Sequence, residues 1–197
     1  MKDIEKVRQS IKTAASELFE HFGYEKTTLE DIALRAHKAK TSVYYHFGGK
    51  IDVLNANLED EFNTIVEKLQ EIRDKHRTEI LPQFSEYLKA RMDLICQARL
   101  YRRFAFDTLM GRGEVARVVK AQRARFDKWE SEYFTGVCNL ALDKGVFSSA
   151  VSPSTFGDMM IMLLKGLEFQ FFYTDDPEAS RATYDEVLER LLSGFCK

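Results

Sequence analysis

The sequence has little proline and glycine and no regular cysteine pattern, and these shortages restrict the kind of protein it can be. Its 197 residues include only 3 Pro and 10 Gly, which leaves little material for loops and favours long helices. The cysteines, Cys96, Cys138 and Cys196, lie far apart. That spacing disfavours both a disulfide framework and a thiolate zinc site. The cytoplasm, where thiols stay reduced, is the expected location.

Long apolar runs and enzyme motifs are also missing. The most apolar segment, residues 159–173, is interrupted by Lys165, Glu168 and Gln170, and it is shorter than the roughly 20 apolar residues that cross a bilayer. The N-terminus is charged from its second residue, unlike a signal peptide. The sequence contains no phosphate-binding glycine loop, serine elbow or metal-ligand histidine pair. We therefore expect no membrane association, no enzyme activity, no metal and no cofactor.

What the sequence does have is apolar residues at helical spacing almost throughout. Hydrophobic residues make up 45% and charged residues 30% of the chain, a mixture typical of soluble globular proteins. Steps of three and four between apolar residues indicate α-helices. The expected helices span residues 4–22, 28–36, 40–47, 51–75, 82–96, 99–110, 114–144, 153–173 and 178–195. We expect an all-α protein with a three-helix head at residues 1–50 and a larger helical body at residues 51–197.

Residues 28–47 have the layout of a helix-turn-helix, in which the second helix enters the DNA major groove. With Val43 and Phe47 turned inward, Thr41 and Tyr45 face the opposite side of a helix. Lysines and hydroxyls suit phosphate oxygens and base edges. The expected DNA-binding residues are Thr28, Lys38, Lys40, Thr41, Ser42, Tyr44, Tyr45, His46 and Lys50. Spacing alone leaves open a small three-helix bundle with a polar surface.

Two segments of the head resemble the tetracycline-repressor (TetR-like) family of transcriptional regulators. They are L-F-E-H-F-G-Y-E-K-T-T-L-E-D-I-A (residues 18–33) and S-V-Y-Y-H-F-G-G-K-I-D-V-L (residues 42–54). The resemblance implies phosphate contacts from Thr28, Tyr44 and Lys50 and base reading around residues 40–45.

The turn departs from the family pattern at three positions. His37 stands where the family usually has glycine, Lys38 replaces an apolar residue, and Ala39 replaces a hydroxyl cap. Histidine tolerates the left-handed conformation better than most residues. Alanine is a poor helix cap, which costs about 1 kcal/mol relative to serine.

The same resemblance implies a small-molecule pocket in the body and a homodimer through the last two helices. Candidate ligand-lining residues are Met92, Phe104, Phe106, Phe126, Trp129, Tyr133, Met159, Met162, Leu163 and Phe169. Candidate dimer-interface residues are Tyr184, Leu188, Leu191, Leu192 and Phe195. Each group could instead form the core of a monomer, since apolar residues at helical spacing are usually core.

The prediction is therefore a homodimeric regulator that binds a double-stranded DNA operator. It is expected to be a repressor released by a small apolar or aromatic effector, although activation stays open. Two alternatives remain. One is a helical carrier of apolar ligands, or an enzyme, whose head no longer binds DNA. The other is a regulator that senses oxidants through its cysteine thiols.

Overall fold

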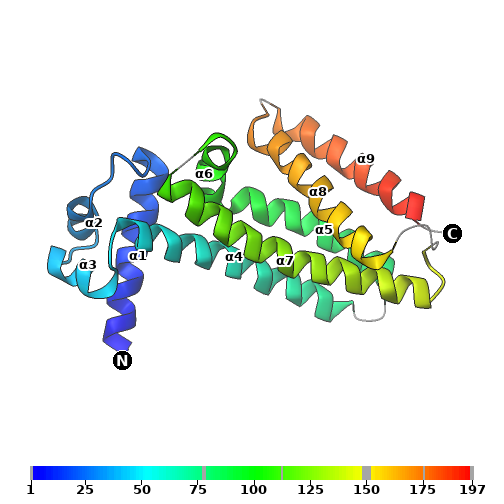
Figure 1. Cartoon of the computed structure of the whole chain (residues 1–197), viewed down its shortest axis with the longest axis horizontal. Helices are drawn as coiled ribbons and strands as arrows, with labels where there is room; N and C mark the ends of the chain where they lie inside the picture. The colour runs from blue at the N-terminus through cyan, green and yellow to red at the C-terminus, as the bar shows by residue number, and fades with distance from the viewer. Residues whose placement is uncertain (1, 77–78, 112, 148–151, 175, 196–197) are drawn as a thin grey trace. The chain divides into compact units, whose positions relative to one another are not determined.

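The computed structural model describes residues 2–76, 79–111, 113–147, 152–174 and 176–195, and it confirms the all-α fold (Figure 1). The helices follow the expected order and differ from the predicted ranges by a few residues at their ends. They are α1 (Lys2–Phe22), α2 (Leu29–Arg35), α3 (Lys40–His46), α4 (Lys50–Lys75), α5 (Ile80–Gln97), α6 (Arg99–Met110), α7 (Glu114–Asp143), α8 (Pro153–Phe172) and α9 (Pro177–Phe195).

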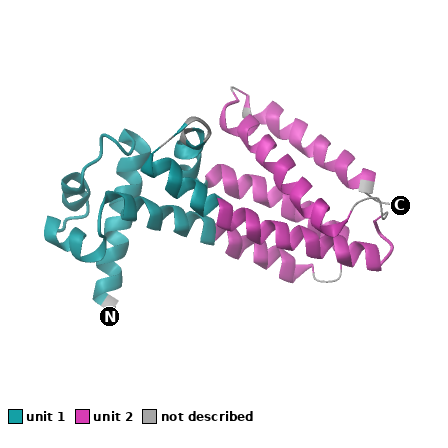
Figure 2. Ribbon diagram, viewed as in Figure 1, with its two compact units in different colours: residues 1–63, 98–123 teal, residues 64–97, 124–197 magenta. Residues whose placement is uncertain are grey.

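The helices are grouped into two compact units, which are coloured separately in Figure 2. Unit 1 comprises residues 1–63 and 98–123, and unit 2 comprises residues 64–97 and 124–197. Helices α4 and α7 therefore contribute residues to both units. The unit that contains the head is larger than residues 1–50. A functional division at residue 50 stays a prediction.

The apolar stripe of α1 forms the centre of unit 1. Ile11, Ala15 and Phe19 are fully buried, and α1 contacts α2, α3 and α6. Gly23 ends α1 in the left-handed conformation, with φ of 81°, and its amide donates to the carbonyl oxygen of Phe19 at 3.0 Å. Glycine adopts this left-handed conformation without strain, and it turns the chain toward α2.

A long-range carboxylate starts α6, which has no side-chain cap of its own. Glu61 of α4 accepts hydrogen bonds from the backbone amides of Leu100 at 2.9 Å and Tyr101 at 3.0 Å. These bonds satisfy two of the amide groups that a helix N-terminus leaves without partners. Burial raises the pKa of Glu61, so this cap is held in a partly dehydrated site within unit 1.

Aromatic rings fill the interior of unit 2. Phe84 of α5 lies 5.9 Å from Phe134 and 6.1 Å from Phe156, measured between ring centroids. Gly157 allows α8 to approach α7 closely, because a Cβ at that position would lie 2.8 Å from the carbonyl oxygen of Ser131. Ser152 caps α8 and Pro153 occupies its first turn, as the sequence indicates.

Candidate nucleic-acid interface

Helix α3 is anchored by one apolar face and presents its other face to solvent. Val43 and Phe47 are buried, whereas Thr41, Tyr44 and Tyr45 are exposed. The side chain of Tyr45 is 74% exposed. This confirms the predicted orientation of the helix. A short helix fixed by its inner face can present hydroxyls and rings without reorganisation.

The turn between α2 and α3 is closed by His37 in the left-handed region, with φ of 54°. The His37 amide donates to Leu34 at 3.1 Å, and the Lys38 amide donates to Ala33 at 2.9 Å, both to carbonyl oxygens. This pair of bonds is the Schellman arrangement. Histidine thus fills a position that the family usually gives to glycine, as predicted. Ala39 precedes α3 without a side-chain cap bond, which agrees with its expected weakness as a cap.

Thr28 uses its hydroxyl locally, at the start of α2. The hydroxyl accepts from the Asp31 amide at 3.1 Å and donates to the Asp31 carboxylate at 2.7 Å. Asp31 in turn accepts from the Thr28 amide at 2.9 Å. A capping box is therefore present, and the Thr28 hydrogen bonds lower the pKa of Asp31. A phosphate contact by Thr28 stays a prediction.

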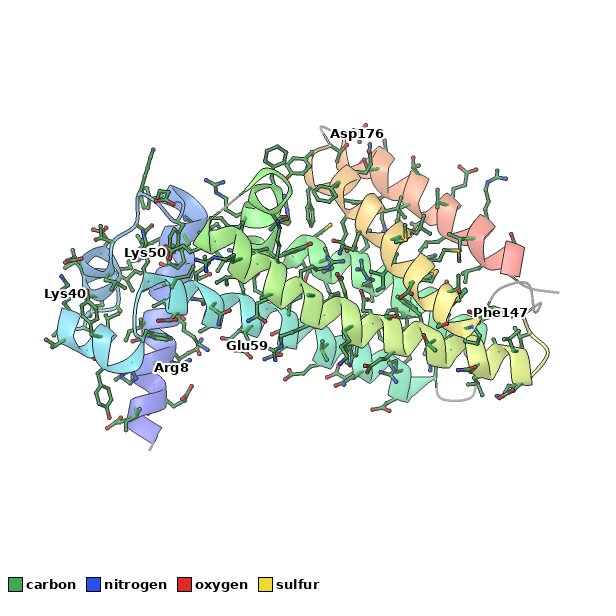
Figure 3. The ribbon with its side chains drawn as sticks, viewed as in Figure 1. Arg8, Lys40, Lys50, Glu59, Phe147 and Asp176 are labelled. Atoms are coloured by element: carbon green, nitrogen blue, oxygen red, sulfur yellow. The ribbon has the colours of Figure 1, made fainter. Side chains whose placement is uncertain are left out.

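Lys38, Lys40 and Lys50 have very different surroundings; Lys40 and Lys50 are labelled in Figure 3. Lys38 is exposed. Lys40 forms a salt bridge with Glu30, and its ammonium lies 5.8 Å from the ring centroid of Tyr44. Lys50 is half-buried and donates to the carbonyl oxygens of Tyr24 at 2.7 Å and Thr27 at 2.8 Å. Of these lysines, Lys38 and Lys40 are the better placed to meet an approaching phosphate.

Sequence reasoning missed Arg8, which lies against the end of α3. Its Nη1 donates to the carbonyl oxygen of His46 at 3.2 Å, and its guanidinium carbon lies 4.3 Å from the Phe47 ring centroid. Arg8 neutralises part of the carbonyl end of α3 and adds a cation beside the half-buried His46. A lone arginine next to an apolar stripe gives no sequence signal for this contact.

The predicted ligand-lining residues are divided between the two units. Phe104 and Phe106 belong to unit 1 and the others to unit 2. Met92, Phe104, Phe126 and Tyr133 are buried, whereas Trp129, Met159, Leu163 and Phe169 are half-buried. Phe106 and Met162 are exposed, with Met162 75% exposed. That these residues line a ligand site stays a prediction.

Unit 2 does have a pocket, of about 480 Å³, although Tyr133 is the only predicted residue in its lining. The guanidinium carbon of Arg73 lies 4.7 Å from the Tyr133 ring centroid. Gln83 also lines the pocket and accepts from the Tyr133 hydroxyl at 3.4 Å. The pocket is therefore more polar than the sequence indicates.

The interior of unit 2 contains charges that the apolar pattern conceals. Arg91 of α5 is fully buried and forms salt bridges with Glu130 at 2.7 Å and Glu168 at 2.6 Å. The Tyr87 hydroxyl donates to Glu130 at 3.1 Å. Nη1 of Arg91 has no hydrogen-bond partner within the described part of the chain. Helical spacing cannot tell a buried charge from one on the surface, so the cluster was missed.

Two of the residues predicted for the dimer interface are buried in the core of the single chain. Tyr184 and Leu188 are each only 1% exposed within the single chain, and the Tyr184 hydroxyl donates to the carbonyl oxygen of Leu88 at 2.7 Å. Neither side chain is available to a partner subunit. Leu191 and Leu192 are half-buried, and the side chain of Phe195 lies outside the described residues.

No helix in the described ranges is both long and apolar enough to span a membrane. In the same ranges, no group of three or more His, Cys, Asp or Glu residues could hold a metal ion.

Comparison with known proteins matches the head to a family. Residues 11–56 match the family described as "Bacterial regulatory proteins, tetR family". Over 56 residues the chain is 43% identical to the HTH-type transcriptional regulator SrpR of Pseudomonas putida, covering 28% of this chain and 26% of SrpR. Over 63 residues it is 33% identical to IcaR of Staphylococcus epidermidis, a negative regulator of the biofilm operon icaADBC, covering 32% of this chain and 34% of IcaR. The matched part thus spans about a quarter to a third of these relatives.

Solved structures match the fold along the whole chain. A TetR transcription regulator from Haloarcula marismortui superimposes with a TM-score of 0.81 at 16% identity, covering 98% of this chain and 100% of that one. NalD of Pseudomonas aeruginosa superimposes with a TM-score of 0.74 at 20% identity, covering 100% and 99%. The head of this chain is therefore a member of the tetR family of bacterial regulatory proteins, and the body that follows it has the fold of TetR-family regulators.

Proposed function

We propose that this chain is a cytoplasmic, homodimeric transcriptional regulator, not an enzyme, that binds a double-stranded DNA operator through α3. The observation that carries the proposal is the anchored helix α3, whose Thr41, Tyr44 and Tyr45 are exposed while Val43 and Phe47 are buried. Two such helices, related by a two-fold axis, would read half-sites about 34–36 Å apart. The tetR-family head supports this reading.

We assign Lys38, Lys40 and Tyr44 to phosphate contacts and Thr41 and Tyr45 to base edges. Lys38 and Lys40 supply exposed cations, that of Lys40 from its salt bridge with Glu30, and each cation that neutralises a phosphate releases counterions, so that affinity falls as salt rises. Thr41 and Tyr45 are on the face of α3 opposite Val43 and can reach the groove floor. Ser42 and His46 are half-buried flanking residues of the same helix.

The test is binding of the full chain to the DNA upstream of its own gene at several salt concentrations. We expect Lys38→Ala to weaken binding on all sequences and to reduce the salt slope by about one unit. Thr41→Ala should change the preference among operator variants by about 1–3 kcal/mol per base pair. Absence of salt-sensitive binding would favour the helical carrier instead.

We further propose that the regulator represses, and that a small aromatic effector releases it from DNA. The repressor direction follows two similar proteins: IcaR is a negative regulator, and NalD is the secondary repressor of a multidrug efflux pump. The effector chemistry follows the pocket of unit 2, where Arg73 lies over the ring of Tyr133. A flat ring with a polar substituent suits such a surface.

Release requires that effector and operator weaken each other's binding by the same factor. Titration calorimetry with a screened aromatic ligand, with and without operator, measures that factor. We expect Arg73→Met to weaken effector binding and to leave operator affinity without effector unchanged. Equal effector affinity in both titrations would contradict release.

A further inference from the structure

The head contains a hollow of about 550 Å³ that helix-turn-helix function does not explain. It is lined by the last turn of α1, by α2 and by the turns before and after α2. Its volume is within the range of small-molecule sites in proteins. All of its lining residues belong to unit 1, so it is separate from the pocket of unit 2.

The hollow exposes large apolar side chains on an otherwise charged surface. Phe22 is 60% exposed and Leu34 is 77% exposed, and both line it beside the half-buried Leu18. Single exposed apolar residues are common on soluble proteins, but an apolar cluster set in a concave site marks a binding surface. Covering these side chains would remove apolar area from water.

The charged residues around the hollow favour a ligand of one charge. Lys26 lines it and has no carboxylate within salt-bridge distance among the residues that the structure describes. Arg35 is paired with Glu17 at 2.6 Å. Among the described lining residues the carboxylate is that of Asp31, which already accepts hydrogen bonds from Thr28. The charge left without a local partner is therefore the ammonium of Lys26.

We propose that this hollow binds an amphipathic organic anion, whose apolar part covers Phe22 and Leu34 and whose carboxylate meets Lys26. The apolar cluster accounts for the apolar part of such a ligand, and the unpaired ammonium of Lys26 accounts for its carboxylate. A neutral apolar compound would leave Lys26 without a partner, and a cation would be repelled by it.

The position of the hollow links it to DNA binding. His37 lines the hollow and is also the left-handed residue that joins α2 to α3. An occupant that contacts His37 restricts this turn, and the turn sets how α3 is presented to DNA. Occupation therefore lowers operator affinity. This second half of the inference rests on the proposed function, whereas ligand binding does not.

Calorimetric titration of the full chain with decanoate, below its micellar concentration, tests the binding half. We expect wild type to bind decanoate, and Leu34→Glu and Lys26→Glu each to weaken one site per chain at least tenfold. Decylammonium, with the same chain length and the opposite charge, should bind wild type more weakly and Lys26→Glu more tightly. Ile4→Glu is the matched control, because Ile4 is a half-exposed apolar residue of α1 outside the hollow.

The proposal is overturned if wild type does not bind decanoate, or if Leu34→Glu and Lys26→Glu bind it with wild-type affinity and stoichiometry. The regulatory half is tested by operator binding with and without decanoate. Decanoate should lower the operator affinity of wild type and leave the operator affinity of Leu34→Glu unchanged. If decanoate binds in the hollow and operator affinity does not change, the regulatory half is overturned. If wild type fails to bind operator without decanoate, the proposed function has failed and calorimetry alone decides the ligand site.

Discussion

Lys50 and Tyr24 are joined by two interactions from a single ammonium group. Lys50 Nζ donates to the main-chain carbonyl oxygen of Tyr24 at 2.7 Å and lies 4.0 Å from the centroid of its ring. The same group donates to the carbonyl oxygen of Thr27 at 2.8 Å. The first residue of α4 thus holds the segment that connects α1 to α2.

Lys50→Met should lower the free energy of unfolding by about 2 kcal/mol, because hydrogen bonds from charged groups contribute about 1.5–3 kcal/mol each and the site is half-buried. Urea denaturation measures this loss. Lys38→Met is the matched control and should leave stability within about 0.5 kcal/mol of wild type, because Lys38 is exposed. Equal stability of the two variants would contradict a holding role for Lys50.

The same pair of variants shows whether Lys50 stabilises the segment between α1 and α2 or contacts a DNA phosphate. We expect Lys50→Met to weaken operator binding with little change in salt slope, because most donors of its ammonium are already used inside the head. Lys38→Met should reduce the slope by about 0.9. Anisotropy titrations between 50 and 200 mM salt, roughly the range over which such contacts are lost, give both slopes. A slope reduced by about one unit in Lys50→Met would restore the phosphate contact that the family resemblance implies.

The start of α3 offers a stabilising change. Ala39 already has the extended N-cap conformation, with φ of −68° and ψ of 147°, but no side-chain cap bond. Ala39→Ser should therefore raise the free energy of unfolding by about 1 kcal/mol, whereas Ala39→Gly should change it by only a few tenths. Thermal unfolding of the full chain measures both. A serine variant no more stable than the glycine variant would show that the hydroxyl does not reach the α3 amides.

The features of the head that could be predicted depend only on residues that are close together in the sequence. Gly23, the Thr28–Asp31 capping box and the left-handed His37 each depend on a few adjacent positions, and all three are present. The inward face of α3 follows from one turn of helical spacing. Such local preferences agree with the fold because backbone conformation and burial point to the same answer.

The features that were missed depend on contacts between distant segments. Arg91 meets Glu130 from another helix, 39 residues away in the sequence, and helical spacing cannot tell a buried ion pair from two surface charges. Likewise, Met162 and Leu188 lie on apolar stripes of neighbouring helices, yet one is exposed and the other is buried. Which side of a broad stripe faces the core depends on the helix packed against it, and that information is not local.

The buried cluster around Arg91 predicts a large and asymmetric effect on stability. Arg91→Met leaves Glu130 and Glu168 buried without their cation, and breaking a buried pair in this way costs about 3–5 kcal/mol. The triple variant Arg91→Met, Glu130→Gln, Glu168→Gln removes the charges together and should recover most of that loss. Urea denaturation compares the two. If the triple variant is no more stable than the single one, the loss arises from packing and not from unpaired charge.

Burial of Cys138 bears on the thiol-sensing alternative. The side chain is 3% exposed, and burial raises the pKa of its thiol. A raised pKa lowers the thiolate fraction near neutral pH, and the thiolate is the reactive form. Native Cys138 should therefore react with a maleimide far more slowly than the same thiol in 6 M urea, as peptide mass mapping would show. Rapid native labelling would support redox sensing, and Cys138→Ser would then be required to abolish it.

The proposed homodimer is the last prediction, and the core positions of Tyr184 and Leu188 change how it should be tested. A charge at Leu188 would unfold the chain rather than separate subunits, because this side chain is only 1% exposed. Leu192 of α9 is half-buried, so Leu192→Glu keeps the fold and places a charge in the proposed interface. An unpaired buried charge costs several kcal/mol, which corresponds to association weaker by about a hundredfold or more.

Sedimentation at micromolar concentration should show a dimer for wild type and a folded monomer for Leu192→Glu. Glu189→Gln, at an exposed position of the same helix, is the control and should remain dimeric. A wild-type monomer with native helicity would contradict the homodimer, and a Leu192→Glu dimer would place its interface away from this face of α9.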